Sequence, residues 1–238
     1  SMECHDLMCF IGQIVVVGGV RRSAMISLSN LSDDRMRHAK SGQWWETAAH
    51  RALANNSVCY TEKPDIETFM REWTALVESK SGERGIFNRE ASKKQAEKYG
   101  RRDPNYEFGT NPCSEIILRP YQFCNLTEVV VRATDTYEDL KRKVKVATIL
   151  GTIQSSYTRF PYLRKIWQRN TEEERLLGVS LTGIMDNPLM TAVNSKLEKT
   201  LDDLRNVALA TNHEYADLLG IPQSAAITCV KPSGTVSQ

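Results

Sequence analysis

Three side chains with versatile chemistry lie within five positions of one another near the middle of the chain: Asn111, Cys113 and Glu115, in the run Asn-Pro-Cys-Ser-Glu. An asparagine amide holds hydroxyl groups, a cysteine sulfur acts as a nucleophile or carries a radical, and a glutamate carboxylate acts as a general base. Together they suit chemistry on a substrate that bears hydroxyl groups. A buried structural cysteine beside a solvated glutamate is the alternative that this short motif leaves open.

The proline within this run restricts the backbone. Pro112 limits its own φ angle and favours an extended conformation at Asn111. In an extended segment, side chains two residues apart point the same way and lie about 6.5–7 Å apart along the chain. We therefore expect Asn111, Cys113 and Glu115 to share one face, and we expect a strand to begin at residues 116–117.

The elements that must position this segment alternate along the chain. Strands are expected over residues 22–28, 85–88, 122–131, 177–183 and 225–230. Helices are expected over residues 35–41, 64–78, 89–98, 137–156, 172–177 and 197–219. Residues 4–20 fit a helix or a strand, and residues 43–58 show no regular pattern. Alternation of this kind predicts an α/β fold with parallel strands.

Three of these helices have clear sequence signals. Pro64 is expected in the first turn of its helix, which has an apolar face formed by Ile66, Phe69, Met70, Trp73, Leu76 and Val77. Thr136 is a typical N-cap for the helix whose apolar positions are Leu140, Val144, Ala147, Leu150 and Ile153. Gly220, with Pro222 beyond it, is a typical stop signal for the last helix.

Composition places the chain among ordinary soluble proteins. It has 238 residues, of which 41% are hydrophobic and 25% are charged, and its net charge is +2. A charge this small gives no reason to expect nucleic acid or a membrane as a partner. No apolar run approaches the roughly 20 residues that span a bilayer. The simplest organisation is one domain or a piece of one.

Six cysteines occur in the chain, and no two of them form a CxxC pair. This number is too small for a disulfide-dense secreted scaffold, and the spacing offers no zinc site, so we predict no metal and a reducing cytoplasmic location. We expect Cys4, Cys9, Cys59 and Cys229 to be small buried residues.

Several motifs together resemble one enzyme family. Asn-Pro-Cys-Ser-Glu-Ile is similar to the active-site finger loop of ribonucleotide reductases, specifically the adenosylcobalamin-dependent class II enzymes. Four further segments resemble that family, in the family's order: residues 18–24, 82–88, 123–128 and 231–238. The resemblance implies that residues 1–238 are a segment of a ten-stranded α/β barrel with the finger loop through its centre.

The resemblance also implies residue roles. Cys113 would carry a thiyl radical that abstracts the 3′-hydrogen of a ribonucleotide. Glu115 would take the 3′-hydroxyl proton, and Asn111 would orient the substrate. Cys124 would be one of the two redox cysteines, although no segment of this chain matches the one that holds its partner. The substrate phosphates would bind Ser233, Gly234 and Thr235, as the start of a helix after a strand allows.

The cofactor and partners follow from the same resemblance. Adenosylcobalamin would supply the radical that oxidises Cys113, and a thioredoxin-like dithiol would reduce the active-site disulfide. The substrate would be a ribonucleoside diphosphate or triphosphate. Because the family's catalytic subunits are considerably longer, we expect the isolated chain to be inactive and to associate with missing segments of the reductase or with another copy. A segment of a class I large subunit and a catalytically silent structural fragment are the alternatives.

Overall fold

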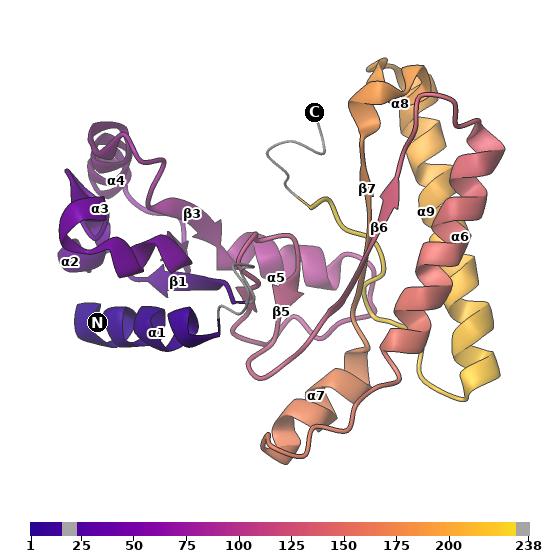
Figure 1. The fold of residues 1–238 in the computed structure, drawn as a ribbon, viewed down its shortest axis with the longest axis horizontal. Helices are drawn as coiled ribbons and strands as arrows, with labels where there is room; N and C mark the ends of the chain where they lie inside the picture. Colours follow the sequence, from indigo (N-terminus) through magenta and orange to yellow (C-terminus); the bar gives the residue numbers. More distant parts are fainter. Residues whose placement is uncertain (16–22, 232–238) are drawn as a thin grey trace. The chain divides into compact units, whose positions relative to one another are not determined.

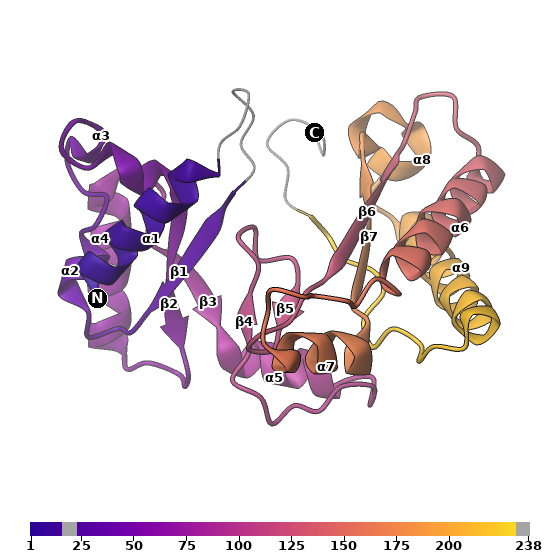
Figure 2. The same cartoon turned by 60° about the horizontal axis from the view of Figure 1, so that its bottom comes forward.

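The computed structural model describes residues 1–15 and 23–231 (Figures 1 and 2). The chain divides into two compact units. The first comprises residues 1–98 and 104–117, and the second comprises residues 99–103 and 118–238. We expected one domain or a piece of one.

A three-stranded parallel sheet forms the centre of the first unit. Its order is β1 (Met25–Ser29), β2 (Ala54–Tyr60) and β3 (Gly85–Asn88). The prediction that residues 43–58 are irregular is wrong, because they contain most of the central strand. Six of the seven residues of β2 are buried, so the strand lacks the alternation of polar and apolar residues by which half-buried strands are identified.

Helices precede and follow the strands of this sheet along the chain. They are α1 (Met2–Ile14), α2 (Asp34–Arg37), α3 (Trp44–Thr47), the 3-10 helix η1 (Ala49–Leu53), α4 (Ile66–Ser79) and α5 (Arg89–Glu97). The ambiguity over residues 4–20 is resolved in favour of a helix as far as residue 14. Cys9 of α1 is buried in a small cluster with Leu53 and Ala54, against which Met25 packs.

Helix α4 buries a different face from the one its apolar spacing predicts. Trp73 is 48% exposed and Ile66 is 76% exposed, whereas Glu72 is 6% exposed. Glu72 is buried because Arg37 and Arg84 both donate hydrogen bonds to its carboxylate. Pro64 also lies outside the helix, since the N-cap is Asp65, whose side chain accepts the N–H of Thr68.

The second unit is built on two parallel strands, β6 (Asn125–Val130) and β7 (Leu177–Thr182). Figure 1 shows the long helices α6 (Tyr137–Gln154) and α9 (Ser195–Leu219) side by side along this strand pair. The remaining elements are α7 (Lys165–Glu174), the 3-10 helix η2 (Ile184–Asp186) and α8 (Pro188–Thr191).

The predicted signals at the ends of the long helices are confirmed. Thr136 and Asp139 form a capping box at the start of α6. Gly220 ends α9 in the left-handed conformation with a φ angle of 64°. The strand expected over residues 225–230 is reduced to one parallel bridge between Val179 and Thr228.

A single large apolar cluster holds the second unit together. Leu140, Val144 and Ala147 of α6 contribute to it as predicted. Leu150, however, is 58% exposed, and the buried positions after Ala147 are Thr148, Gly151 and Thr152. The hydroxyls of Thr148 and Thr152 each donate to the backbone carbonyl four residues earlier, at 2.8 Å, so both hydroxyls are satisfied.

An α/β fold with parallel strand pairing is therefore confirmed at this coarse level. The described residues form sheets of three, two and two strands, and the ten-stranded barrel stays a prediction. Within residues 1–15 and 23–231, none of the helices combines the length and the apolar composition that crossing a bilayer requires.

Replacing Leu140 with alanine tests the core of the second unit. Leu140 is fully buried, so Leu140→Ala is expected to lower the free energy of unfolding by about 2–5 kcal/mol. Leu150→Ala on the same helix is the matched control and should change it by no more than about 0.5 kcal/mol. Urea unfolding followed by circular dichroism measures both. Equal losses in the two variants would contradict this account of the core.

Candidate active-site loop

The segment around Cys113 is a tight turn between two short paired strands, β4 (Gly109–Thr110) and β5 (Ile117–Leu118). The N–H of Ser114 donates to the backbone carbonyl of Asn111 at 2.9 Å, which closes a β-turn. The expected extended segment is therefore wrong. The φ angle that proline imposes suits the second position of a β-turn as well as an extended strand, and Pro112 occupies that position.

Asn111 also closes the loop through its side chain. Its Oδ1 accepts the N–H of Ile116 at 3.0 Å. The hydroxyl of Thr110 donates to the carbonyl of Ile116, also at 3.0 Å. No described residue accepts a hydrogen bond from Nδ2 of Asn111, so this amide nitrogen retains two donors for a ligand.

Cys113 and Glu115 lie in contrasting environments within the turn. Cys113 is exposed, whereas both carboxylate oxygens of Glu115 are buried and have no hydrogen-bond partner among the described residues. Between them, Ser114 has a φ angle of 63°, which is costly for a residue other than glycine and is typical of functional sites. A buried carboxylate without a partner is also costly. Both features are unfavourable to the free energy of folding, and both lie at or beside the predicted reactive residues.

Buried side chains and hydrogen bonds hold this loop in the first unit. Phe108 is fully buried before the turn and Ile116 is 4% exposed after it. Nε of Arg89 donates to the carbonyl of Phe108 at 2.8 Å. Nδ2 of Asn55, at the start of β2, donates to the carbonyl of Pro112 at 2.7 Å. The peptide that precedes Cys113 is thus tied to the central strand of the sheet.

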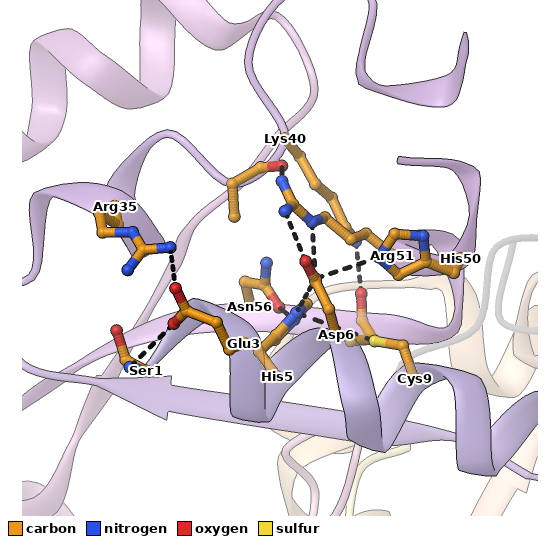
Figure 3. A network of polar contacts seen from close by, with 12 residues as sticks. Ser1, Glu3, His5, Asp6, Cys9, Arg35, Lys40, His50, Arg51 and Asn56 are labelled. Atoms are coloured by element: carbon orange, nitrogen blue, oxygen red, sulfur yellow. Dashed lines mark hydrogen bonds and ion pairs between the residues drawn. The ribbon is translucent and has the colours of Figure 1, made fainter. Parts of the chain in front are cut away.

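Strand β2 is held in turn by a polar network on α1 and the segments beside it (Figure 3). Nε2 of His5 lies 2.9 Å from Oδ1 of Asn56, and the backbone N–H of Asn56 donates to Glu83 at 2.8 Å. Asp6 accepts two hydrogen bonds from Arg51, at 2.8 and 2.7 Å. This bidentate pair holds the pKa of the Asp6 carboxyl well below its usual range.

The remaining cysteines only partly follow the expected burial. Cys9 and Cys59 are buried, as predicted, but Cys4 is exposed and Cys229 is half-buried. Burial raises the pKa of the Cys9 and Cys59 thiols, so both are poor nucleophiles. The expectation for Cys4 is wrong because Cys4 lies on a face of α1 that the described residues do not cover.

The other predicted site residues lie outside this loop. Cys124 is half-buried and belongs to the second unit. We expected a strand that contains Cys124, but β6 begins at the next residue. Cys113 belongs to the first unit. Ser233, Gly234 and Thr235 lie outside the described residues.

Sequence reasoning missed Asn55 and Thr110, both of which hydrogen-bond the loop. Asn55 lies in the segment for which no regular structure was expected. Asparagine is depleted in strands, so the pair Asn55-Asn56 beside the apolar end of β2 is a signal that could have indicated a specific polar role.

The fold and the loop together define a class of protein. The first unit is a parallel α/β unit that presents an exposed cysteine on a tight turn, with a buried carboxylate two residues further on. No family model matches the chain. Similarity to individual proteins is, however, extensive.

The chain is 31% identical to the adenosylcobalamin-dependent ribonucleoside-triphosphate reductase of Lacticaseibacillus paracasei. It is 29% identical to the enzyme of the same description from Lactobacillus leichmannii. Each alignment covers 100% of this chain, and they cover 34% and 35% of the respective relatives. A crystal structure described as a B12-dependent (class II) ribonucleotide reductase matches with a TM-score of 0.73 and 25% identity, covering 98% of this chain and 35% of that one.

The chain is therefore similar over its full length to class II ribonucleotide reductases, as the motifs indicated. It spans about a third of the length of the relatives it matches. These relatives carry the description adenosylcobalamin-dependent, which favours class II over class I.

The Asp6–Arg51 pair predicts a pH dependence of stability. Because the pKa of Asp6 is lowered in the folded state, its contribution is present above its unfolded pKa of about 4 and is lost as the pH falls below that value. Asp6→Asn should lower the free energy of unfolding by about 1–2 kcal/mol at pH 7 and weaken its decline between pH 5 and pH 2. Denaturant titrations across this range measure the effect.

Asp202→Asn provides the control, because Asp202 is exposed on α9. This variant should keep the wild-type pH dependence. A pH profile for Asp6→Asn that parallels the wild type would show that the ion pair does not carry the effect.

Proposed function

We propose that this chain carries the reactive loop of a ribonucleotide reductase that converts a ribonucleoside triphosphate into its 2′-deoxy form. The reaction consumes two electrons from a dithiol, which becomes a disulfide, and it releases the 2′-hydroxyl as water. The observation that carries the proposal is the pairing within one turn of the exposed Cys113 with the buried, unpartnered carboxylate of Glu115. The names of the relatives support the triphosphate as substrate.

Each loop residue has a distinct role in this reaction. The Cys113 sulfur, as a thiyl radical, takes the 3′-hydrogen of the ribose and becomes a thiol. The Glu115 carboxylate accepts the 3′-hydroxyl proton, and the substrate hydroxyl supplies the hydrogen-bond partner that the carboxylate lacks. The free Nδ2 donors of Asn111 hold a substrate oxygen, while Oδ1 keeps the turn closed. Loss of the 2′-hydroxyl is then easy, because the neighbouring carbon carries the radical.

The exposure of Cys113 fits a cofactor that reaches the sulfur from outside the loop. When bound, adenosylcobalamin supplies the one-electron oxidant that converts the thiol into a thiyl radical. We assign Cys113 as the residue that contacts the cofactor. The chain's own residues then bind the ribose, orient it and accept its proton.

The remaining assignments belong to the same proposal. Cys124 supplies one of the two electron-donating thiols, which a thioredoxin-like dithiol restores. Ser233, Gly234 and Thr235 bind the substrate phosphates. Residues 1–238 form a segment of the ten-stranded catalytic barrel, with the loop at its centre, and the protein acts in the cytoplasm.

A chimera tests the role of Cys113. Residues 1–238 replace the matched segment of the Lacticaseibacillus paracasei reductase, and the product is assayed with adenosylcobalamin, a dithiol and a ribonucleoside triphosphate. Cys113→Ala should abolish deoxyribonucleotide formation, because no other sulfur occupies that position. Cys4→Ser, which alters an exposed cysteine outside the loop, should retain activity. Activity in Cys113→Ala, or its absence from a chimera that folds, would refute the proposal.

Glu115→Gln in the same chimera tests the general base. The amide keeps the size of the carboxylate but does not accept the proton, so kcat should fall by about 100- to 10,000-fold. The substitution should also raise the free energy of unfolding, because burying an amide without a partner costs less than burying a carboxylate without one. Product analysis and urea unfolding measure the two effects. Unchanged kcat would remove Glu115 from the mechanism.

A further inference from the structure

We propose that Asn55 is a positioning residue for Cys113, acting through the carbonyl of Pro112. The inference rests on the proposed function and adds to it a residue outside the loop. Nδ2 of Asn55 lies 2.7 Å from the Pro112 carbonyl oxygen, and the carbon of that carbonyl is bonded to the nitrogen of Cys113.

The Asn55 hydrogen bond differs in kind from those that shape the turn. The bonds from Ser114 to Asn111, from Ile116 to the Asn111 side chain and from Thr110 to Ile116 all join residues of the loop to one another. They set the internal shape of the turn, but they do not fix its direction relative to the sheet. The bond from Asn55 joins the loop to β2.

Strand β2 is a rigid support for such a contact. It is the central strand of the sheet, paired with β1 and β3. Successive side chains of a strand point to opposite faces, and Ala54 and Asn56, on either side of Asn55, are 0% and 3% exposed. The side chain of Asn56 is held by His5 (Figure 3), and its backbone N–H donates to Glu83. The network on one face of β2 therefore fixes the orientation of Asn55 on the other.

The position of this peptide matters for hydrogen abstraction. A peptide unit is planar, so a hydrogen bond to the Pro112 oxygen restricts rotation of the plane that contains the Cys113 nitrogen. Reacting atoms must approach to about 3–3.5 Å, and a displacement of about 1 Å costs on the order of a hundredfold in rate. Asn55 thus acts on the reaction through the placement of the sulfur, without touching the substrate.

Two substitutions separate the hydrogen bond from the bulk of the side chain. Asn55→Ala removes both. Asn55→Asp keeps the shape, but its carboxylate has no donor and faces a carbonyl oxygen. When that carboxyl is protonated, its O–H becomes a donor and restores the contact. Asn30→Ala is the matched control, because Asn30 is an exposed asparagine at the end of the neighbouring strand β1.

Hydrogen exchange of the full chain provides the direct measurement. Peptides that contain the amides of Ser114 and Ile116 should exchange about fivefold faster in Asn55→Ala, because a typical hydrogen bond shifts an opening equilibrium by roughly that factor. At pH 7, Asn55→Asp should exchange as fast as Asn55→Ala. At pH 4, the ratio of its exchange rate to the wild-type rate should fall towards one. Asn30→Ala should exchange at the wild-type rate. Wild-type exchange in Asn55→Ala would overturn the inference.

Turnover in the reductase chimera provides the second readout. Asn55→Ala should lower kcat by about tenfold or more with little change in KM, because the substrate contacts remain. Faster exchange with unchanged kcat would overturn the positioning role. If the wild-type chimera folds but forms no deoxyribonucleotide, the proposed function fails, and the exchange ratio still decides whether Asn55 anchors the loop. The two failures are therefore distinguishable.

Discussion

The side chain of Asn111 is the constraint on which the shape of the loop around Cys113 depends. Its Oδ1 and its backbone carbonyl each accept an N–H from the far side of the turn, from Ile116 and Ser114. One residue thereby closes the turn twice, and Cys113 is presented at its exposed end. A carboxylate at this position would accept the same bonds but would lose the two N–H donors that the amide retains.

The loop combines features that oppose stability. The left-handed φ angle of Ser114 and the unpartnered carboxylate of Glu115 are both unfavourable. They persist because the surrounding structure holds the loop, through the buried Phe108 and Ile116 at its ends. A pre-organised active site requires a scaffold that tolerates such unfavourable conformations and buried charges at its functional residues.

The two units differ in their apolar cores, although each contains a buried glutamate paired with two arginines, Glu72 in the first unit and Glu174 in the second. The second unit has one large apolar cluster between β6, β7, α6 and α9. The first has small apolar clusters and several buried ion pairs, among them Glu72 with Arg37 and Arg84. Removing one partner of such a pair leaves an uncompensated buried charge, so single substitutions there are costly. The orientation of β2, and with it the position of Asn55, depends on the polar contacts of Asn56 with His5 and Glu83.

The sequence by itself indicated the similarity to class II ribonucleotide reductases, the α/β class with parallel strands, the start of α6 and the end of α9. These properties follow from local signals, such as the Thr136 cap, the Gly220 stop and the Asn-Pro-Cys-Ser-Glu motif. The tertiary structure alone decided that residues 111–116 form a turn, since Pro112 suits both a turn and a strand. It also decided which face of α4 is buried and that Asn55 reaches Pro112. Apolar spacing shows that a helix has an apolar face. Only packing, and hydrogen bonds between residues far apart in the sequence, determine which residues that face contacts.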